Sequence, residues 1–482
     1  MRINLYLGIA RVEFNAIDNS SNAQLYSDYT GISTNLAKNS TYSLTITPQY
    51  NVGTNNAVGY SVWIDYNMNG DFSDIGEQVF TQSPVTGGAP VTGNVSLPVS
   101  VNNGNTRMRV SLKFDGVPGP CEVFTYGEVE DYNVYLFDGL IYRNNIWSPN
   151  APSILSSAES VLIENGTYTI NTDISVDNIE VNSGATVNVD KANSVTVANG
   201  IVNNGDFVLN SDSNEYSSLL VDGVVTGNVR YNRHVNSNAN GNDLIAPPVS
   251  GQAFTDFISN NSNILSNSGQ TLYLFGPFEK PVNEYQLYAN VESANLEAGK
   301  GYRAASTNNQ GFMFSGAVTN SALNLPIVKV GNTFDKWNLI GNPYTSYIKL
   351  ADFLAANILE LDAQSAAVYG YDADDSNGSK WAIWNLAYSD ANPNTLIAPG
   401  QGFFVSSKDG GANISFAPSM RASGSSDDFI AGRTGNSIVH SIIEISTEIQ
   451  TYGTEFYFND NSTLGLDLGY DAEHFGGAPA SF

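Results

Sequence analysis

Short runs of alternating apolar and polar residues, separated by turn residues, fill the chain from Tyr42 to Val134. Tyr42–Thr47 and Thr106–Leu112 are two examples. A period of two places successive side chains on opposite faces of a strand, and many short strands at regular spacing favour an antiparallel sandwich. We therefore expect an antiparallel β-sandwich over residues 1–138.

A short phrase ending in Gly recurs between about Leu155 and Val235. Its copies are Ile163–Gly166, Val181–Gly184 and Val202–Gly205, which start 18 and then 21 residues apart. A strand and a turn repeated about every 20 residues are typical of a β-solenoid, whose coils bury apolar faces against their neighbours. We predict a short β-helix or solenoid over residues 139–235, with an ordinary β-sandwich as the alternative.

A longer duplication follows, with an offset that stays between 95 and 101 residues. The matched segments are Asp243–Pro248 with Asn338–Pro343, Phe254–Ile258 with Leu350–Leu354, and Leu296–Arg303 with Ile397–Phe404. Order and offset are both preserved, which predicts two copies of one β-rich unit at residues 236–330 and 331–421. The second matched pair predicts the only substantial helical turns of the chain.

The last part begins with a Ser-, Gly- and Asp-rich linker, Ala422–Asp428. Alternation over Val439–Ile445 and Thr454–Phe458 predicts two strands. We expect residues 429–482 to be the start of an incomplete C-terminal β-domain. The predicted fold class is therefore all-β and multi-domain, with antiparallel β-sandwiches and a short β-helix or solenoid segment.

Charge and composition exclude several classes of partner. The 482 residues include 47 acids and 20 Lys plus Arg, which gives a formal charge of −27. Nucleic acid and anionic membrane surfaces both require clustered Lys and Arg, and the sequence has no such cluster. The acidic balance fits either a solvated surface or attraction of divalent cations. Asn, Ser, Thr and Gly dominate the polar residues, as in extracellular β proteins.

The termini and the single cysteine add to this picture. No run of 18 apolar residues occurs, so no membrane-spanning segment is expected. The N-terminus lacks a signal-peptide pattern, which suggests that a signal has been removed or that the chain lies within a longer precursor. Cys121 has no other cysteine to pair with in this chain.

The clearest chemical motif is the segment Asp65–Glu77. Oxygen-bearing side chains at alternate positions, followed by Gly70 at the sixth, let a loop wrap a hard cation such as calcium. Glu77 stands at the thirteenth position, whereas an EF-hand closes at the twelfth. The predicted calcium ligands are Asp65, Asn67, Asn69 and Asp71, completed by Asp74 and Glu77. An Asx-rich hairpin turn without metal is the alternative.

Other chemistry has weaker support. The acidic segment Asp372–Gly378 reads as a solvated hairpin tip, and the three histidines, His234, His440 and His474, are far apart in sequence. Nucleophile elbows, zinc-binding spacings and phosphate loops are absent from the sequence, so we expect a non-enzymatic protein. A distant pair of carboxylates acting on a glycosidic bond stays open. Trp337, Trp381 and Trp384 are either core residues or platforms for sugar rings.

The first domain resembles the GEVED domain of secreted Bacteroidota proteins. The resemblance rests on Trp63–Asn67, Gly70–Phe72, Asn105–Val110, Cys121–Glu122 and the complete eponymous phrase Gly127–Asp131. It implies a second cysteine before this chain begins, as the partner of Cys121. It also implies that Glu128, Glu130 and Asp131 lie at a domain edge.

The remaining chain, with its solenoid and its Trp337–Tyr344 and Pro399–Phe404 phrases, is similar to large exported proteins of gliding flavobacteria. That resemblance implies an adhesin-like cargo of the type IX secretion system, extracellular or on the outer membrane after export. Its expected partners are the secretion machinery and an external surface or polysaccharide. The alternative is a polysaccharide-binding accessory region of a larger secreted enzyme.

Overall fold

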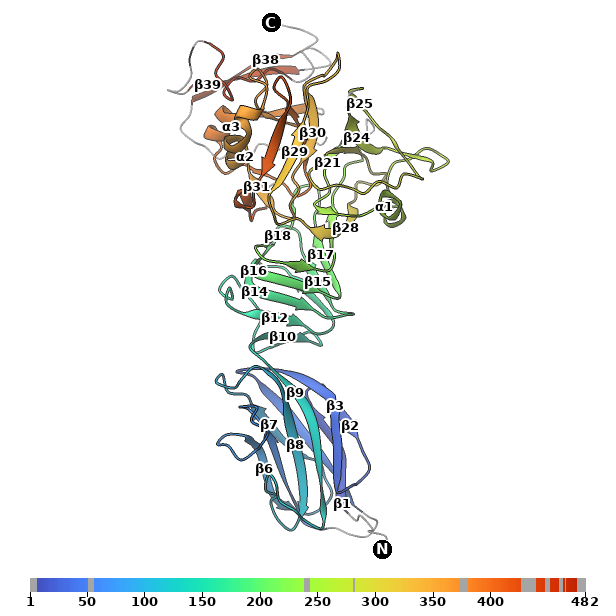
Figure 1. Cartoon of the computed structure of the whole chain (residues 1–482), viewed down its shortest axis with the longest axis vertical. Coiled ribbons are helices and arrows are strands. Elements are labelled where there is room, and N and C mark those ends of the chain that lie inside the picture. The colour runs from blue at the N-terminus through green and yellow to red at the C-terminus, as the bar shows by residue number, and fades with distance from the viewer. Residues whose placement is uncertain are drawn as a thin grey trace. The chain divides into compact units, whose positions relative to one another are not determined.

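The computed structural model describes residues 7–50, 56–237, 243–280, 282–372, 380–425, 439–446, 451–458, 463 and 465–474. Two compact units are present. The N-terminal unit comprises Met1–Pro152 and Glu159–Leu162, and the C-terminal unit comprises Ser153–Ala158 and Ile163–Phe482. Both are built mainly from strands (Figure 1), so the predicted all-β, multi-domain fold with sandwich and solenoid segments is confirmed.

Two sheets form the sandwich of the N-terminal unit, with strand orders β2-β1-β4-β7 and β3-β9-β8-β5-β6. Among the described residues, the strand pairs of these sheets are antiparallel except β3 with β9, which run parallel. The strands are β1 (Leu7–Phe14), β2 (Ile17–Ser20), β3 (Tyr26–Ala37), β4 (Thr41–Tyr50), β5 (Val58–Ile64), β6 (Gln78–Val85), β7 (Val91–Ser96), β8 (Gly104–Phe114) and β9 (Gly127–Phe137), followed by β10 (Gly139–Arg143), β11 (Ile146–Ser148) and β12 (Ser160–Ile163).

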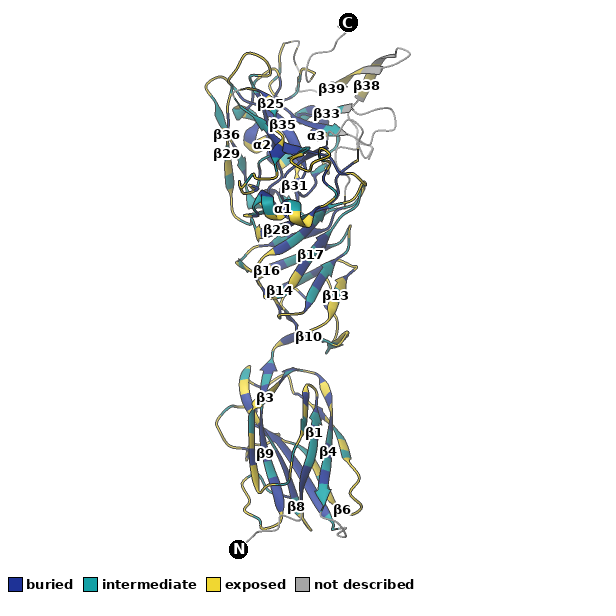
Figure 2. Ribbon diagram, turned by 90° about the vertical axis from the view of Figure 1, so that its right-hand side faces the viewer, coloured by how far each residue is buried: buried dark blue, intermediate teal, exposed yellow. Residues whose placement is uncertain are grey.

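The sandwich core follows from the alternation seen in the sequence. Val12 and Ile46 of one sheet and Val62 and Val110 of the other are fully buried in a single cluster. Buried and more exposed residues alternate along β4 (Figure 2), whereas β5 is buried along its whole length. Burial of apolar surface is the main favourable term in folding, so the loops at the ends of the strands are held by a rigid scaffold.

The solenoid lies in the C-terminal unit and has about four turns. One parallel stack contains β13 (Thr167–Ile170), β15 (Thr186–Val189), β17 (Asp206–Asn210) and β20 (Val229–Arg233). A second contains β14 (Ile174–Val181), β16 (Ser194–Asn203), β18 (Ser218–Val221) and β19 (Val225–Thr226). Figure 1 shows the two stacks as successive layers of arrows.

Matching side chains stack from coil to coil. Asn232 donates through Nδ2 to Oδ1 of Asn210, and Asn210 donates in the same way to Asn188, each at 2.9 Å. Gly205 belongs to the recurring phrase, and a Cβ there would lie 2.3 Å from the carbonyl oxygen of Ala185. Gly205 is therefore required by the close approach of neighbouring coils, whereas Gly166 and Gly184 are favoured by their positive φ of 79° and 81°.

Two copies of one strand pair follow the solenoid. In the first, β21 (Asp243–Ile245) pairs with β27 (Tyr302–Ala304), and in the second β30 (Trp337–Gly341) pairs with β35 (Gly402–Ser406). The register is equivalent, since Leu244 opposes Arg303 in one copy and Leu339 opposes Phe404 in the other. Each copy has a helix after its first strand: α1 (Phe254–Asn260) and α2 (Leu350–Asn357).

The expectation of helical turns only at these two positions is wrong, because α3 (Leu386–Ala391) is a third helix. Asn385 caps it by accepting a hydrogen bond from the Tyr388 N–H at 2.8 Å. Asn is among the preferred N-cap residues, so this signal was present in the sequence.

The other elements of the C-terminal unit are short. They are β22 (Val249–Ser250), β23 (Leu272–Tyr273), β24 (Phe275–Glu279), β25 (Glu284–Tyr285), β26 (Tyr288–Ala289), β28 (Phe312–Val318), β29 (Leu323–Ile327), β31 (Tyr347–Lys349), the 3₁₀ turn Ile358–Glu360, β32 (Val368–Asp372), β33 (Lys380–Trp384), β34 (Leu396–Ile397), β36 (Ala412–Phe416), the 3₁₀ turn Pro418–Met420, β37 (Arg421–Ala422), β38 (Val439–Ser446) and β39 (Thr451–Phe458). The last two confirm the predicted strands and form an antiparallel hairpin.

Buried Arg233 ties the solenoid to both copies. It ends β20, is fully buried, and donates through Nε to the carbonyl oxygen of Gly400 at 2.9 Å. Its Nη1 lies 3.7 Å from Oδ2 of Asp243. A buried guanidinium needs such partners, so the solenoid and the two copies fold as one unit.

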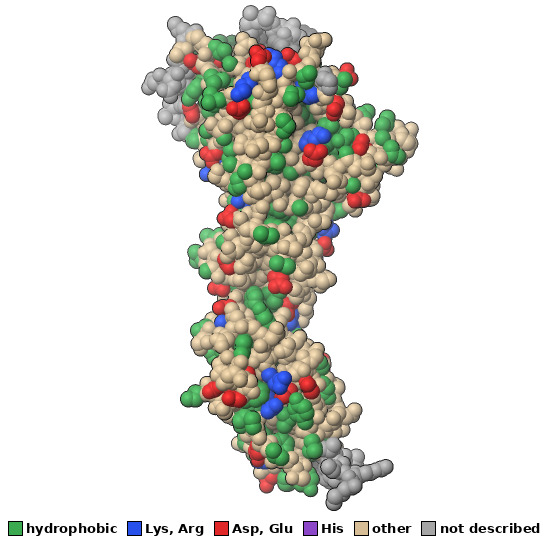
Figure 3. Space-filling model, viewed as in Figure 1, with side chains coloured by type: hydrophobic (Ala, Val, Ile, Leu, Met, Phe, Trp, Pro, Cys, Tyr) green, Lys and Arg blue, Asp and Glu red, His purple; other side chains and the backbone are tan. Residues whose placement is uncertain are grey.

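The distribution of charged side chains on the surface of the described residues (Figure 3) agrees with the low charged content of the sequence. Figure 3 shows a face on which acidic and basic side chains are scattered among much uncharged surface. None of the helices in the described part of the chain combines the length and apolarity that crossing a membrane requires.

Candidate metal centre

The Asp65–Glu77 loop connects β5 to β6 at one end of the sandwich. Its two ends are joined by the Ile64 N–H, which donates to the Glu77 carbonyl oxygen at 2.9 Å. Strand β8 holds the first residue of the loop. The Asp65 N–H donates to the Arg107 carbonyl oxygen at 3.1 Å, and the Thr106 hydroxyl donates to the Asp65 carbonyl oxygen at 2.6 Å.

Asp65 organises the first half of the loop. Its side chain is 4 % exposed and accepts hydrogen bonds from the N–H groups of Asn69, at 3.2 Å, and Gly70, at 2.9 Å. The backbone turns through positive φ at Met68 (62°) and Gly70 (90°). Gly adopts this region without steric cost, which explains Gly at the sixth position of the motif.

Asp74 connects the two amides of the motif to the second half of the loop. Asn67 and Asn69 each donate through Nδ2 to Oδ2 of Asp74 at 2.7 Å. Asp71 accepts from the Ser73 N–H at 2.9 Å and from its hydroxyl at 2.8 Å, and these bonds lower the pKa of Asp71. Both Asp71 and Asp74 are exposed.

Glu77 closes the loop as a buried carboxylate. It is 1 % exposed, and its Oε1 accepts from the Tyr66 N–H at 3.0 Å. Its Oε2 is buried and has no hydrogen-bond partner among the described residues. Desolvation raises the pKa of Glu77, and the nearby negative charge of Asp65 adds to this rise. A buried carboxylate with one oxygen unpaired is costly, so a cation at this position would compensate it.

Three of the six predicted ligands come together. One carboxylate oxygen each of Asp71, Asp74 and Glu77 lies within 4.8 Å of the other two. Asn67 and Asn69 contact this cluster through their hydrogen bonds to Asp74, and Asp65 bonds the Asn69 N–H. Carboxylate and amide oxygens suit a hard cation, and the residues present therefore fit calcium.

The expectation that the acids of the GEVED phrase lie at a domain edge is wrong. Glu128, Glu130 and Asp131 are fully buried on β9, which lies between β3 and β8. Asp131 accepts from Arg109 Nε at 2.8 Å and from Nη2 at 2.7 Å. The Arg109 guanidinium also lies 4.9 Å from the ring centroid of Phe72, a residue of the metal loop.

Glu128 is the second buried acid whose environment disfavours its charge. It accepts from the Ile9 N–H at 2.8 Å and from the Ser27 hydroxyl at 3.1 Å. Burial raises its pKa to about 7, with a further contribution from the nearby Glu130 carboxylate. This acid was not a predicted site residue, and no sequence pattern distinguishes it from a surface Glu.

The remaining sequence candidates lie elsewhere. Trp337 and Trp384 are 4 % and 3 % exposed and pack against Tyr369 and Tyr388, as core residues do. Cys121 is exposed and free. The acidic segment Asp372–Gly378 falls outside the described residues, apart from the backbone of Asp372.

Comparison with known proteins gives two matches. The GEVED domain matches residues 59–135, which confirms the resemblance of the first domain and includes the whole metal loop. A domain of unknown function, DUF8693, matches residues 142–482. No curated protein matches the chain. Because the second match covers more than half of the sequence, the chain belongs to the DUF8693 family.

Proposed function

We propose that this chain is a non-enzymatic, exported protein of the adhesin or surface-display type, whose first domain is stabilised by calcium. The observation that carries the proposal is the Glu77 carboxylate. Its buried Oε2 has no described partner, and one of its two oxygens lies within 4.8 Å of a carboxylate oxygen each of exposed Asp71 and Asp74. A divalent cation would neutralise this cluster and replace the missing partner.

An extracellular location suits such a site. Calcium-binding extracellular modules have dissociation constants of about 10⁻⁴ to 10⁻³ M, which matches weak sites on exposed turns. The GEVED domain occurs in extracellular proteins as a carbohydrate-binding-like domain. The acidic, Asn- and Ser-rich composition supports the same location.

Export through the type IX secretion system completes the proposal. It rests on the resemblance of the C-terminal unit to exported flavobacterial proteins and places the protein outside the cell or on the outer membrane. The stiff solenoid would then act as a spacer, because coils stacked through Asn ladders and close glycines give a continuous core.

Calcium binding is tested by isothermal titration of the full chain at low and moderate salt. We expect the double variant Asp71→Asn/Asp74→Asn to lose one binding event that wild type shows. Asp115→Asn is the matched control, since Asp115 is an exposed acid of the same unit at φ 48°, a conformation that Asn also adopts. An identical titration for wild type and the double variant would overturn the proposal.

A further inference from the structure

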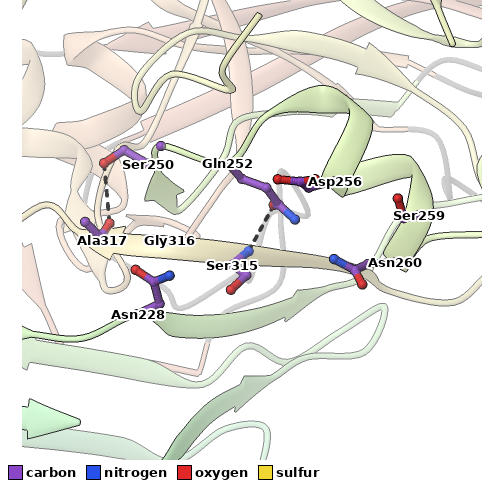
Figure 4. Close-up of a pocket in the computed structure, with 10 residues that line it drawn as sticks. Asn228, Ser250, Gln252, Asp256, Ser259, Asn260, Ser315, Gly316 and Ala317 are labelled. Atoms are coloured by element: carbon purple, nitrogen blue, oxygen red, sulfur yellow. Dashed lines mark hydrogen bonds between the residues drawn. The ribbon is translucent and has the colours of Figure 1, made fainter. Parts of the chain in front are cut away.

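A polar groove lies in the C-terminal unit, on the first of the two copies. It has a volume of about 560 Å³ and is bounded by α1, by β28 and by the turns before β20 and after β22. Figure 4 shows Gln252, Asp256 and Asn260 on one side of the groove and Asn228 on the other, with Ser315 between them. These residues come from four separate parts of the chain.

The lining has the chemistry of a site for hydroxyl groups. The side chains that line it are amides, hydroxyls and one carboxylate: Asn228, Gln252, Asn260, Ser250, Ser259, Ser315 and Asp256. Among the described lining residues there is no Lys, Arg or aromatic side chain. An anionic ligand would therefore meet Asp256 without a compensating cation.

The side-chain amide of Gln252 is held in one orientation within the lining. It is 7 % exposed, and its Oε1 accepts from the Ser315 N–H at 3.0 Å, as the dashed line in Figure 4 shows. This bond sets the orientation of the amide. Its Nε2 is buried and has no hydrogen-bond partner among the described residues. Buried donors are nearly always paired in folded proteins, so this one is suited to a ligand oxygen.

Neighbouring groups supply acceptors for the same ligand. The Ser259 hydroxyl donates to the Thr255 carbonyl oxygen at 2.7 Å and keeps its lone pairs free to accept. Asp256 is exposed on the same helix and accepts only. A sugar hydroxyl both donates and accepts, so it can bridge Gln252 Nε2 and these acceptors.

The second copy lacks four of these polar groups although it has an equivalent strand pair and helix, and it keeps an acid, Asp352, at the position of Asp256. The equivalences that relate Asn261 to Asn357 and Met313 to Ser415 place apolar residues at four of the lining positions. Ile348, Ala355, Ala356 and Ala417 stand where Gln252, Ser259, Asn260 and Ser315 stand in the first copy. The fold of the copy therefore does not need the polar lining, which points to a separate role.

We propose that this groove binds a segment of a neutral polysaccharide through hydrogen bonds to its hydroxyl groups. Gln252 provides the buried donor, and Asp256 and Ser259 provide acceptors. The site lies in the C-terminal unit and contains no predicted metal ligand, so it goes beyond the calcium-stabilised display function proposed above.

The test is isothermal titration of the full chain in EDTA with neutral hexaoses of the cellulose, mannan, xylan and laminarin types, and with oligogalacturonate as the acidic probe. Ser259→Ala introduces Ala, the residue found at the equivalent position of the second copy, and Asp256→Asn removes the carboxylate. Asp352→Asn is the matched control, because Asp352 is exposed at the equivalent position of α2.

We expect at least one neutral oligosaccharide to bind, with about tenfold weaker affinity in each groove variant, as the loss of one hydrogen bond predicts. The Asp352→Asn variant should bind like wild type. Absence of binding by every neutral probe, binding of the acidic probe alone, or equal binding by Ser259→Ala would overturn the proposal. The EDTA keeps these outcomes separate from any failure of the calcium site.

Discussion

Asn261 and Asn357 make the same hydrogen bonds in the two copies of the duplicated unit. Asn261 donates through Nδ2 to the carbonyl oxygens of Phe257, at 2.8 Å, and Met313, at 3.1 Å, and accepts from the Met313 N–H at 2.7 Å. Asn357 has equivalent bonds to Phe353 and Ser415, at 2.9, 3.0 and 2.7 Å. Each buried amide thus joins the end of a helix to a strand.

Asn357→Ala and Asn261→Ala should each destabilise their copy by about 2–4 kcal/mol, because backbone groups of the helix and strand lose their partners inside the protein. Urea unfolding followed by tryptophan fluorescence measures this, since Trp337 and Trp384 are buried in the second copy. Asn214→Ala, at an exposed turn of the solenoid, is the control. Losses below about 0.5 kcal/mol, the range of ordinary surface substitutions, would show that the shared bonds are not structural.

More of the fold than of the candidate sites could be predicted from the sequence. Alternation, the Gly-ended phrase and the duplication are local patterns, and they were enough to predict the sandwich, the solenoid and helices α1 and α2. The Asp65–Glu77 loop is also continuous in sequence, which is why the sequence brings Asp71, Asp74 and Glu77 together in one segment. The polar groove was missed because Asn228, Gln252 and Ser315 come together only through tertiary packing.

Burial could not be inferred from residue type. Glu128, Glu130 and Asp131 are usually surface residues, yet the sandwich encloses all three. The partners that make this possible, such as Arg109 and Tyr132, are recognisable only once strand register is known. That Oε2 of Glu77 has no partner likewise cannot be recognised before the strand register is known.

Glu128 should make the N-terminal unit less stable as pH rises. Its pKa is about 7 in the folded protein, above the ordinary value of 4.5, so its contribution to stability is complete below pH 4.5 and is lost as pH rises to about 7. Glu128→Gln should flatten the stability profile over this window and leave the variant more stable than wild type at pH 8. Urea midpoints measured from pH 4 to pH 8 test this. Parallel profiles for the two proteins would contradict it.

Gly205→Ala should destabilise the solenoid by about 2–4 kcal/mol, in the range of other close steric conflicts in packed regions. The added Cβ would lie 2.3 Å from the Ala185 carbonyl oxygen and 2.5 Å from that of Asn182. Asn204→Ala changes the exposed neighbouring residue and should have little effect. Hydrogen exchange of β15 and β17 amides reports on this region directly, and unchanged protection in Gly205→Ala would show that the coils can move apart.

Export predicts that the protein is accessible on intact producing cells. Protease added outside should remove the chain while a cytoplasmic marker persists, as measured by immunoblotting before and after cell lysis. Protection of the chain until the cells are lysed would contradict surface display.

The central claim, that calcium compensates the buried Glu77 carboxylate, is tested most directly by thermal unfolding of wild type and Glu77→Gln in EDTA and in excess calcium. Removing the buried charge should make Glu77→Gln at least as stable as wild type in EDTA. Calcium at a hundredfold excess over its dissociation constant should stabilise wild type by about 2.7 kcal/mol and leave Glu77→Gln unchanged. An equal response of both proteins to calcium, or none in wild type, would contradict the account.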